Sequence, residues 1–141
     1  MSDSCIVGID YGGERIGVAV SDTAKKIAFS LDVIYREGTS YGLKRLKSLL
    51  TDRVIESFVV GLPYRENGNL GEEGREVLQY AESLEDYFGV KVITWDERYT
   101  TIAAEKILRS NELNREGRKK VIDMIAAQLI LQSYLDHLHA D

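Results

Sequence analysis

Hydrophobic positions at the start of the chain follow the period of β-strands. Two apolar runs, Cys5–Ile9 and Ile16–Val20, flank the turn signal Tyr11-Gly12-Gly13, which predicts a β-hairpin. Every odd position from Ile27 to Val33 is apolar, which predicts a third strand over Ile27–Ile34 with these positions on its buried face. The first quarter of the chain is therefore expected to form three antiparallel strands.

The remaining pattern alternates between helical and strand periods. Two further strands are predicted, at Phe58–Val60 and Val90–Trp95, and four helices, at Tyr41–Leu50, Glu72–Tyr87, Ile102–Leu108 and about 117–137. The segment Tyr64–Gly74, rich in glycine and asparagine, reads as a surface loop. Because successive parallel strands need crossover connections, this order predicts an α/β domain over residues 1–141, with a mixed five-stranded sheet covered by helices.

Two carboxylates are placed at strand ends. Asp10 follows the first apolar run and precedes the glycine turn, although a purely turn-capping aspartate would look the same. Asp96 and Glu97 follow the fifth strand, where an ordinary solvated loop is the alternative. If the first, fourth and fifth strands run parallel, Asp10, the Gly61-Leu62-Pro63 turn and Glu97 share one edge of the sheet, where open α/β sheets place their ligand sites.

A third carboxylate stands in an apolar environment. Asp123 is embedded in the run from Val121 to Ala127, where an ionised carboxylate is costly unless it is paired or binds a metal. The small residues Ala126 and Ala127 would let this helix approach the sheet closely and bring Asp123 toward Asp10 and Glu97.

Three convergent carboxylates form a hard-oxygen site that suits Mg²⁺ or Mn²⁺. Two such ions about 4 Å apart can activate a water molecule on one side and stabilise a leaving oxygen on the other. This predicts a metal-dependent nuclease that hydrolyses phosphodiester bonds, with metal ligands and catalytic residues Asp10, Glu97 and Asp123. Asp96 or Asp22 could add a fourth acid.

Several polar residues near this edge could contact nucleic acid. The candidates for phosphate contacts are Arg15, Arg65, Arg98, Thr100 and Thr101. An arginine beside an acid can equally form a simple salt bridge, and one of the two threonines is expected to be a helix N-cap. Basic residues also bunch at Lys44, Arg45 and Lys47, a pattern that is usually a solvated helix face.

Composition narrows the class of protein. A net charge of −5 and a pI near 5.1 argue against a broad basic surface that coats nucleic acid, but not against local contacts. The single cysteine, Cys5, lies in an apolar run and has no partner for a disulfide, which suits a reducing compartment. No apolar stretch is long enough to span a membrane and no signal-peptide pattern is present, so a cytoplasmic location is expected. Both a monomer and a homodimer are compatible with the sequence.

A set of motifs resembles one known family. They are Gly8-Ile9-Asp10-Tyr11-Gly12, Arg15 to Asp22, Val60-Gly61-Leu62-Pro63, Asp96-Glu97-Arg98-Tyr99-Thr100-Thr101, and Asp123 with Ala126-Ala127. In this order, over nearly the whole chain, they resemble the YqgF family of Holliday-junction-resolvase-like proteins that act in pre-16S rRNA processing and ribosome biogenesis. The resemblance implies a ribonuclease H-like fold and assigns the catalytic acids to Asp10, Glu97 and Asp123. Unlike the resolvases, the chain has no acid where its fourth strand ends at Gly61-Leu62-Pro63.

Three alternatives remain open from the sequence. One is a Holliday-junction-type DNA resolvase. Another is a nucleic-acid-binding module without turnover. The third is the ATP-dependent kinase and chaperone superfamily, whose Asp-x-Gly hairpin cradles phosphate, although those proteins need two such domains and 141 residues supply one.

Overall fold

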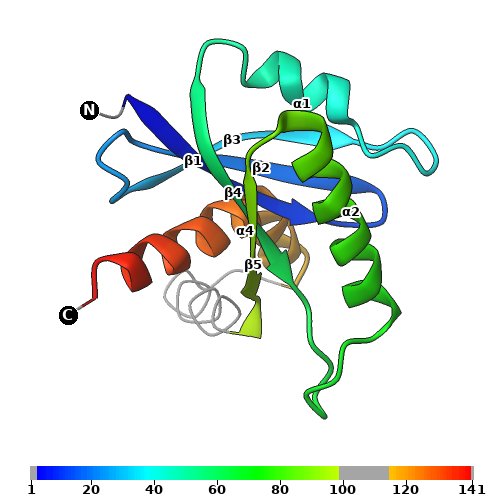
Figure 1. Cartoon of the computed structure of the whole chain (residues 1–141). Helices are drawn as coiled ribbons and strands as arrows, with labels where there is room; N and C mark the ends of the chain where they lie inside the picture. The colour runs from blue at the N-terminus through cyan, green and yellow to red at the C-terminus, as the bar shows by residue number, and fades with distance from the viewer. Residues whose placement is uncertain (1–2, 99–114, 141) are drawn as a thin grey trace.

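A mixed five-stranded sheet forms the centre of the molecule (Figure 1). The computed structural model describes residues 3–98 and 115–140. In the second of these segments, side chains are described from residue 125 onward. The strands are β1 (Ser4–Tyr11), β2 (Arg15–Ser21), β3 (Ala28–Tyr35), β4 (Val54–Leu62) and β5 (Lys91–Asp96), in the order β3-β2-β1-β4-β5. β1 pairs antiparallel with β2, and β2 with β3, whereas β1 pairs parallel with β4, and β4 with β5. The predicted fold class is confirmed.

Helices cover both faces of this sheet. α1 (Leu43–Leu49) and α2 (Glu72–Phe88) lie on one face, and α4 (Arg115–Leu138) crosses the other (Figure 1). Each face buries its own apolar core, one around Leu46, Tyr80 and Leu84, and one around Ile130 and Leu131. The predicted helix at Ile102–Leu108 lies outside the described residues. No helix in the described part of the chain is both long and apolar enough to cross a membrane.

The fourth strand is longer than the apolar run that predicted it. β4 begins at Val54 and continues through Gly61 and Leu62, which pair with Trp95 and Asp96 of β5. The predicted turn at Gly61-Leu62-Pro63 is therefore partly strand. Backbone pairing on both sides of a central strand determines its extent, so polar or glycine positions do not interrupt it.

A bulge in β3 reverses the predicted buried face at its beginning. The register of β3 against β2 shifts by one residue at Leu31, which has no partner on β2. Ala28 is buried in the core under α4, whereas Ile34, on the other side of the bulge, is buried in the core under α1 and α2. Ile27 and Phe29 are 52% and 51% exposed. The prediction that all odd positions face the core is wrong, because an extra residue in the ladder changes the face of every residue beyond it.

Glycines allow α4 to lie directly against the sheet. A Cβ atom at Gly8 would stand 2.6 Å from Leu131 Cβ and 2.9 Å from the Ala127 carbonyl oxygen. At Gly17, which pairs with Asp10, a Cβ atom would lie 3.4 Å from Ala127 Cβ. The helix backbone therefore approaches β1 and β2 more closely than any side chain at Gly8 would permit.

We predict that Gly8→Ala lowers the free energy of unfolding by about 1–3 kcal/mol, because the added methyl group must push α4 away from β1. Gly13→Ala is the matched control. A Cβ atom there meets nothing within 4 Å, and the change should stay within about 0.5 kcal/mol. Urea unfolding of both variants measures the difference, and equal stabilities would contradict the close approach of α4.

Candidate active site

The structure brings Asp10 and Glu97 together at one edge of the sheet. Asp10 lies near the end of β1, and Glu97 follows the last residue of β5. Because β1, β4 and β5 run parallel, their carboxyl ends meet at this edge. The Glu97 backbone N–H donates to the Leu62 carbonyl oxygen at 3.1 Å, which anchors Glu97 beside β4. The two carboxyl groups are close enough to share a hydrogen bond.

The environment of Glu97 favours its protonated form. Burial is the largest cause, followed by the negative charge of Asp10 and the hydrogen bond with it, and together with Glu73 and Asp96 they raise the pKa of Glu97 to about 7. Two ionised carboxylates in contact repel each other unless a positive charge compensates them. Near neutral pH part of the molecules therefore keep a proton on the pair, and a bound cation would favour the fully ionised pair.

A glycine in β4 makes room for the Glu97 side chain. A Cβ atom at Gly61 would lie 2.6 Å from Glu97 Oε1 and 2.6 Å from Ile130 Cδ1 of α4. Any larger residue at Gly61 would displace the carboxylate or the helix. The absence of an acid at the end of β4 is thus linked to the presence of one after β5, since both would occupy the same space.

A hollow of about 330 Å³ opens over this pair. It is lined by Asp10 and Glu97, by the β1–β2 turn, and by Glu73 and Glu76 from the first turns of α2. Glu73 could not be singled out from the sequence, because acids are common in the first turn of a helix, where they interact favourably with the helix dipole. Among the side chains that the structure describes, no three His, Cys, Asp or Glu residues are placed to hold a metal ion, so Asp10 and Glu97 stand as a pair.

The third predicted acid belongs to α4. Asp123 lies within Arg115–Leu138, but its side chain is outside the described part of the structure. Ala127, one helical turn later, is buried and packs against Gly8 and Gly17. Thr100 and Thr101 also lie outside the described residues.

The two candidate fourth acids have other partners. Asp96 accepts hydrogen bonds from Arg98, with Nη2 and Oδ2 2.6 Å apart, and this contact lowers the pKa of Asp96. Asp22 accepts hydrogen bonds from the backbone N–H groups of Lys26 and Ile27, which lower its pKa. Asp22 thus closes the β2–β3 turn, at the end of β2 remote from Asp10.

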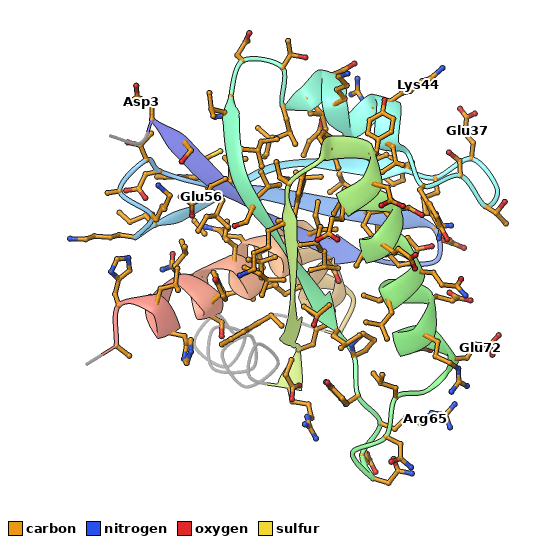
Figure 2. All side chains as sticks on the ribbon, in the orientation of Figure 1. Asp3, Glu37, Lys44, Glu56, Arg65 and Glu72 are labelled. Carbon is orange, nitrogen blue, oxygen red and sulfur yellow. The ribbon has the colours of Figure 1, made fainter. Side chains whose placement is uncertain are left out.

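The predicted arginines have different neighbours. Arg98 is joined to Asp96, its guanidinium stands 4.8 Å from the Tyr64 ring centre, and its side chain is 54% exposed. Arg65 packs against Gly71, where α2 begins, and Figure 2 shows Arg65 and Glu72 at this end of the molecule. Arg15 begins β2, and its carbonyl oxygen accepts a hydrogen bond from Gly12 across the hairpin turn.

We predict that Glu97→Gln stabilises the metal-free protein in a pH-dependent way. A folded pKa of about 7 is raised above the ordinary value, so the stability associated with protonated Glu97 is present below about pH 4.5 and is lost as the pH rises through 7. Glutamine cannot ionise, and at pH 8 the variant should be more stable than wild type by up to about 3 kcal/mol.

Urea unfolding in EDTA at pH 5 and pH 8 measures this difference. Glu82→Gln, at an exposed position of α2, is the control and should follow wild type at both pH values. A Glu97→Gln variant with the same stability difference at both values would contradict the raised pKa.

Comparison with known proteins identifies the family. Residues 4–137 match the RuvX family, described as Holliday junction resolvase. A protein of Bacillus licheniformis is 44% identical over 137 residues, which cover 96% of this chain and 99% of the relative. A protein of Clostridioides difficile is 42% identical over 136 residues, with 96% of each chain covered. Both carry the provisional name of pre-16S rRNA nuclease.

Two solved structures share the fold. RuvC of T. thermophilus, in complex with a Holliday junction substrate, has a TM-score of 0.56 at 17% identity, with 96% of each chain covered. The fowlpox virus Holliday junction resolvase has a TM-score of 0.53 at 13% identity and covers 95% of this chain and 99% of its own. The sequence matches over nearly the full length confirm the resemblance to the YqgF family, and this chain belongs to that family, also called RuvX.

Proposed function

We propose that this protein is a Mg²⁺- or Mn²⁺-dependent nuclease that processes the 5′ end of precursor 16S rRNA. The observation that carries the proposal is the contact between Asp10 and Glu97 in a hollow at the carboxyl edge of the sheet, with the pKa of Glu97 raised to about 7. Perturbed carboxyl pairs in clefts are typical of functional sites. The choice of substrate follows the names of the relatives from B. licheniformis and C. difficile.

The donor set fits a divalent metal. Asp10 and Glu97 offer carboxylate oxygens, which Mg²⁺ and Mn²⁺ prefer, and a cation relieves the repulsion that otherwise keeps a proton on the pair. Asp123 is the proposed third ligand. It precedes Ala127 by four positions in α4, and residues at this spacing share one side of a helix. Ala127 packs at Gly17, the partner of Asp10 in the β1–β2 ladder.

Each part of the site has a defined role in this proposal. Bound divalent ions would supply an activated water and would stabilise charge on the leaving oxygen. Asp10 and Glu97 hold and orient these ions, and the packing of Ile130 and Gly61 around Glu97 limits the approach of bulk water. The protein then needs no nucleophilic side chain, and its one thiol, Cys5, is buried near the opposite end of β1.

Substrate binding is assigned to local contacts at this edge. Arg98 is the best placed of the predicted residues, since it follows Glu97 directly and keeps about half of its side chain exposed while Asp96 orients it. Arg15, Arg65, Thr100 and Thr101 complete the proposed phosphate contacts. A protein of net charge −5 binds RNA through such a limited set and not through a general basic surface.

We predict that Asp10→Asn and Asp123→Asn each reduce cleavage of a labelled RNA carrying precursor 16S 5′ sequence by about two to three orders of magnitude. Both variants should stay folded, because each loses one charge from a crowded acidic site. Asp86→Asn, at an exposed position in the last turns of α2, should cleave like wild type. The assay is run with Mn²⁺, Mg²⁺ or EDTA.

Each outcome of this assay has a definite meaning. Retained activity in Asp123→Asn would remove that residue from the site. RNA binding by wild type without cleavage in either metal would reject the nuclease and favour a non-catalytic nucleic-acid-binding module. Cleavage of a four-way DNA junction in preference to the RNA would favour a Holliday junction resolvase.

A separate prediction concerns Arg98. Arg98→Ala should weaken RNA binding in EDTA and reduce the slope of log affinity against log salt concentration by about one, because one phosphate contact is lost. Arg53→Ala, remote from the carboxyl edge because Arg53 precedes β4, is the control. An unchanged salt slope in Arg98→Ala would limit Arg98 to its contact with Asp96.

A further inference from the structure

A second hollow, of about 350 Å³, adjoins the one that contains Asp10 and Glu97. The two hollows share Tyr11, Gly13 and Glu76 in their walls. The second, called here the tyrosine hollow, is bounded by the β1–β2 turn, by the loop that precedes α1 and by α2. A ligand that reaches the carboxyl pair can therefore continue into it over the β1–β2 turn.

Aromatic rings form one side of the tyrosine hollow. Tyr11 and Tyr41 are partly exposed and line it, with ring centres 6.0 Å apart at 73°. Tyr80 is fully buried behind them, 4.5 Å from Tyr11 and 5.4 Å from Tyr41 between ring centres. This support from α2 fixes the two outer rings. Tyr80 and the Arg36 guanidinium already lie against the Tyr11 ring, whereas the contacts of Tyr41 with both neighbouring rings are T-shaped. Tyr41 is therefore the ring suited to bind a flat, aromatic ligand by stacking.

Arg36 holds the opposite parts of the hollow together. Its guanidinium donates hydrogen bonds to the carbonyl oxygens of Gly12 at 2.8 Å, Gly13 at 3.1 Å and Ser40 at 2.9 Å. The same group stands 4.7 Å from the centre of the Tyr11 ring. The β1–β2 turn and the loop before Tyr41 are thereby joined, so the hollow exists before any ligand binds.

The polar side chains of the hollow suit the edge of a base. Glu76 and Gln79 of α2, together with Thr39, line it beside Arg36, whose guanidinium already donates to backbone carbonyl oxygens. A carboxylate repels phosphate but accepts hydrogen bonds from N–H groups, and the amide and hydroxyl groups can both donate and accept. Stacking rings beside such groups are the means by which proteins bind unpaired bases.

We propose that the tyrosine hollow binds one unpaired nucleobase of the substrate strand, next to the phosphodiester that the proposed metal site at Asp10 and Glu97 would cleave. This inference rests on the proposed nuclease function and deepens it: the substrate is single-stranded, or has a base turned out of its helix, beside the cleavage position.

The surface next to the tyrosine hollow could bind the nucleotides that follow the bound base along the RNA. A larger hollow of about 710 Å³ shares Arg36 and Tyr41 with it and is lined by Lys44, Arg45 and Tyr35, which is 74% exposed. Figure 2 shows Lys44 and Glu37 on this side of the molecule. Lys44 and Arg45, which their sequence pattern alone assigns to a solvated helix face, would here meet phosphates of the following nucleotides.

The test uses a single-stranded RNA of precursor 16S 5′ sequence in which one nucleotide at a time is made abasic. Binding is measured in EDTA, so that it does not depend on cleavage, and the cleavage position is mapped separately with Mn²⁺. For wild type, one abasic position near the cleavage position should weaken binding about tenfold, the usual effect of losing one stacked base. Tyr41→Ala should weaken binding of intact RNA by a similar factor and remove the penalty at that position.

Two further variants serve as controls for the binding measurements with Tyr41→Ala. Tyr87→Ala removes a tyrosine of α2 that is 42% exposed and outside the hollow, and it should retain the abasic penalty. Thr39→Trp fills the hollow from an exposed position and should also weaken binding of intact RNA and remove the abasic penalty. It keeps the Tyr41 ring, so it tests the hollow even if Tyr41→Ala disturbs folding. Thermal unfolding shows whether each variant is folded.

The outcomes separate this inference from the proposed function. An abasic penalty that persists in both Tyr41→Ala and Thr39→Trp, the absence of any sensitive position, or no RNA binding in EDTA would each overturn the base-binding hollow. Absence of metal-dependent cleavage, with the penalty lost in both variants, would reject the nuclease and leave the hollow established.

Discussion

The close approach of α4 to the sheet is the constraint on which the rest of the structure depends. It is possible because Gly8, Gly17 and Gly61 present no Cβ atom to the helix, so Ala127, Ile130 and Leu131 pack directly on backbone. This contact closes one of the two apolar cores. It also places Asp10 and Glu97 beside the helix, where burial makes the largest contribution to the raised pKa of Glu97. The contact between α4 and the glycines of the sheet therefore determines both the packing of this core and the burial of Glu97.

The fold holds Asp10 and Glu97 in contact although their negative charges repel each other. Two acids in contact lower the stability of the metal-free protein at neutral pH, and such conflicts are typical of sites that function through a bound cation. The proposed division of work follows from the positions of the two hollows. Asp10 and Glu97 lie at the carboxyl edge, with α4 packed beside Glu97 on one side and the first turns of α2 lining their hollow on the other. The tyrosines of the proposed base-binding hollow lie next to α2, and the β1–β2 turn connects the two hollows.

Much of this arrangement could be predicted from the sequence. Strong apolar periods located all five strands, and the parallel relation of β1, β4 and β5 then implied that Asp10 and Glu97 share an edge. The bulge at Leu31 could not be predicted, since periodicity does not reveal an extra residue in a ladder. Glu73 and the cluster of tyrosines could not be predicted for another reason. Their significance depends on neighbours that are distant in the sequence, and Tyr11, Tyr41 and Tyr80 meet only after the chain has folded. The site assignment of Asp123 stays a prediction.

The pKa of Glu97, measured by carboxyl ¹³C NMR on the protein first in EDTA and then with Mg²⁺, tests the carboxyl pair most directly. We predict a value of about 7 without metal and a marked decrease when Mg²⁺ binds, because the cation replaces the shared proton. A value near 4.5 that does not respond to Mg²⁺ would contradict this prediction, since Asp10 and Glu97 would then be ordinary surface acids.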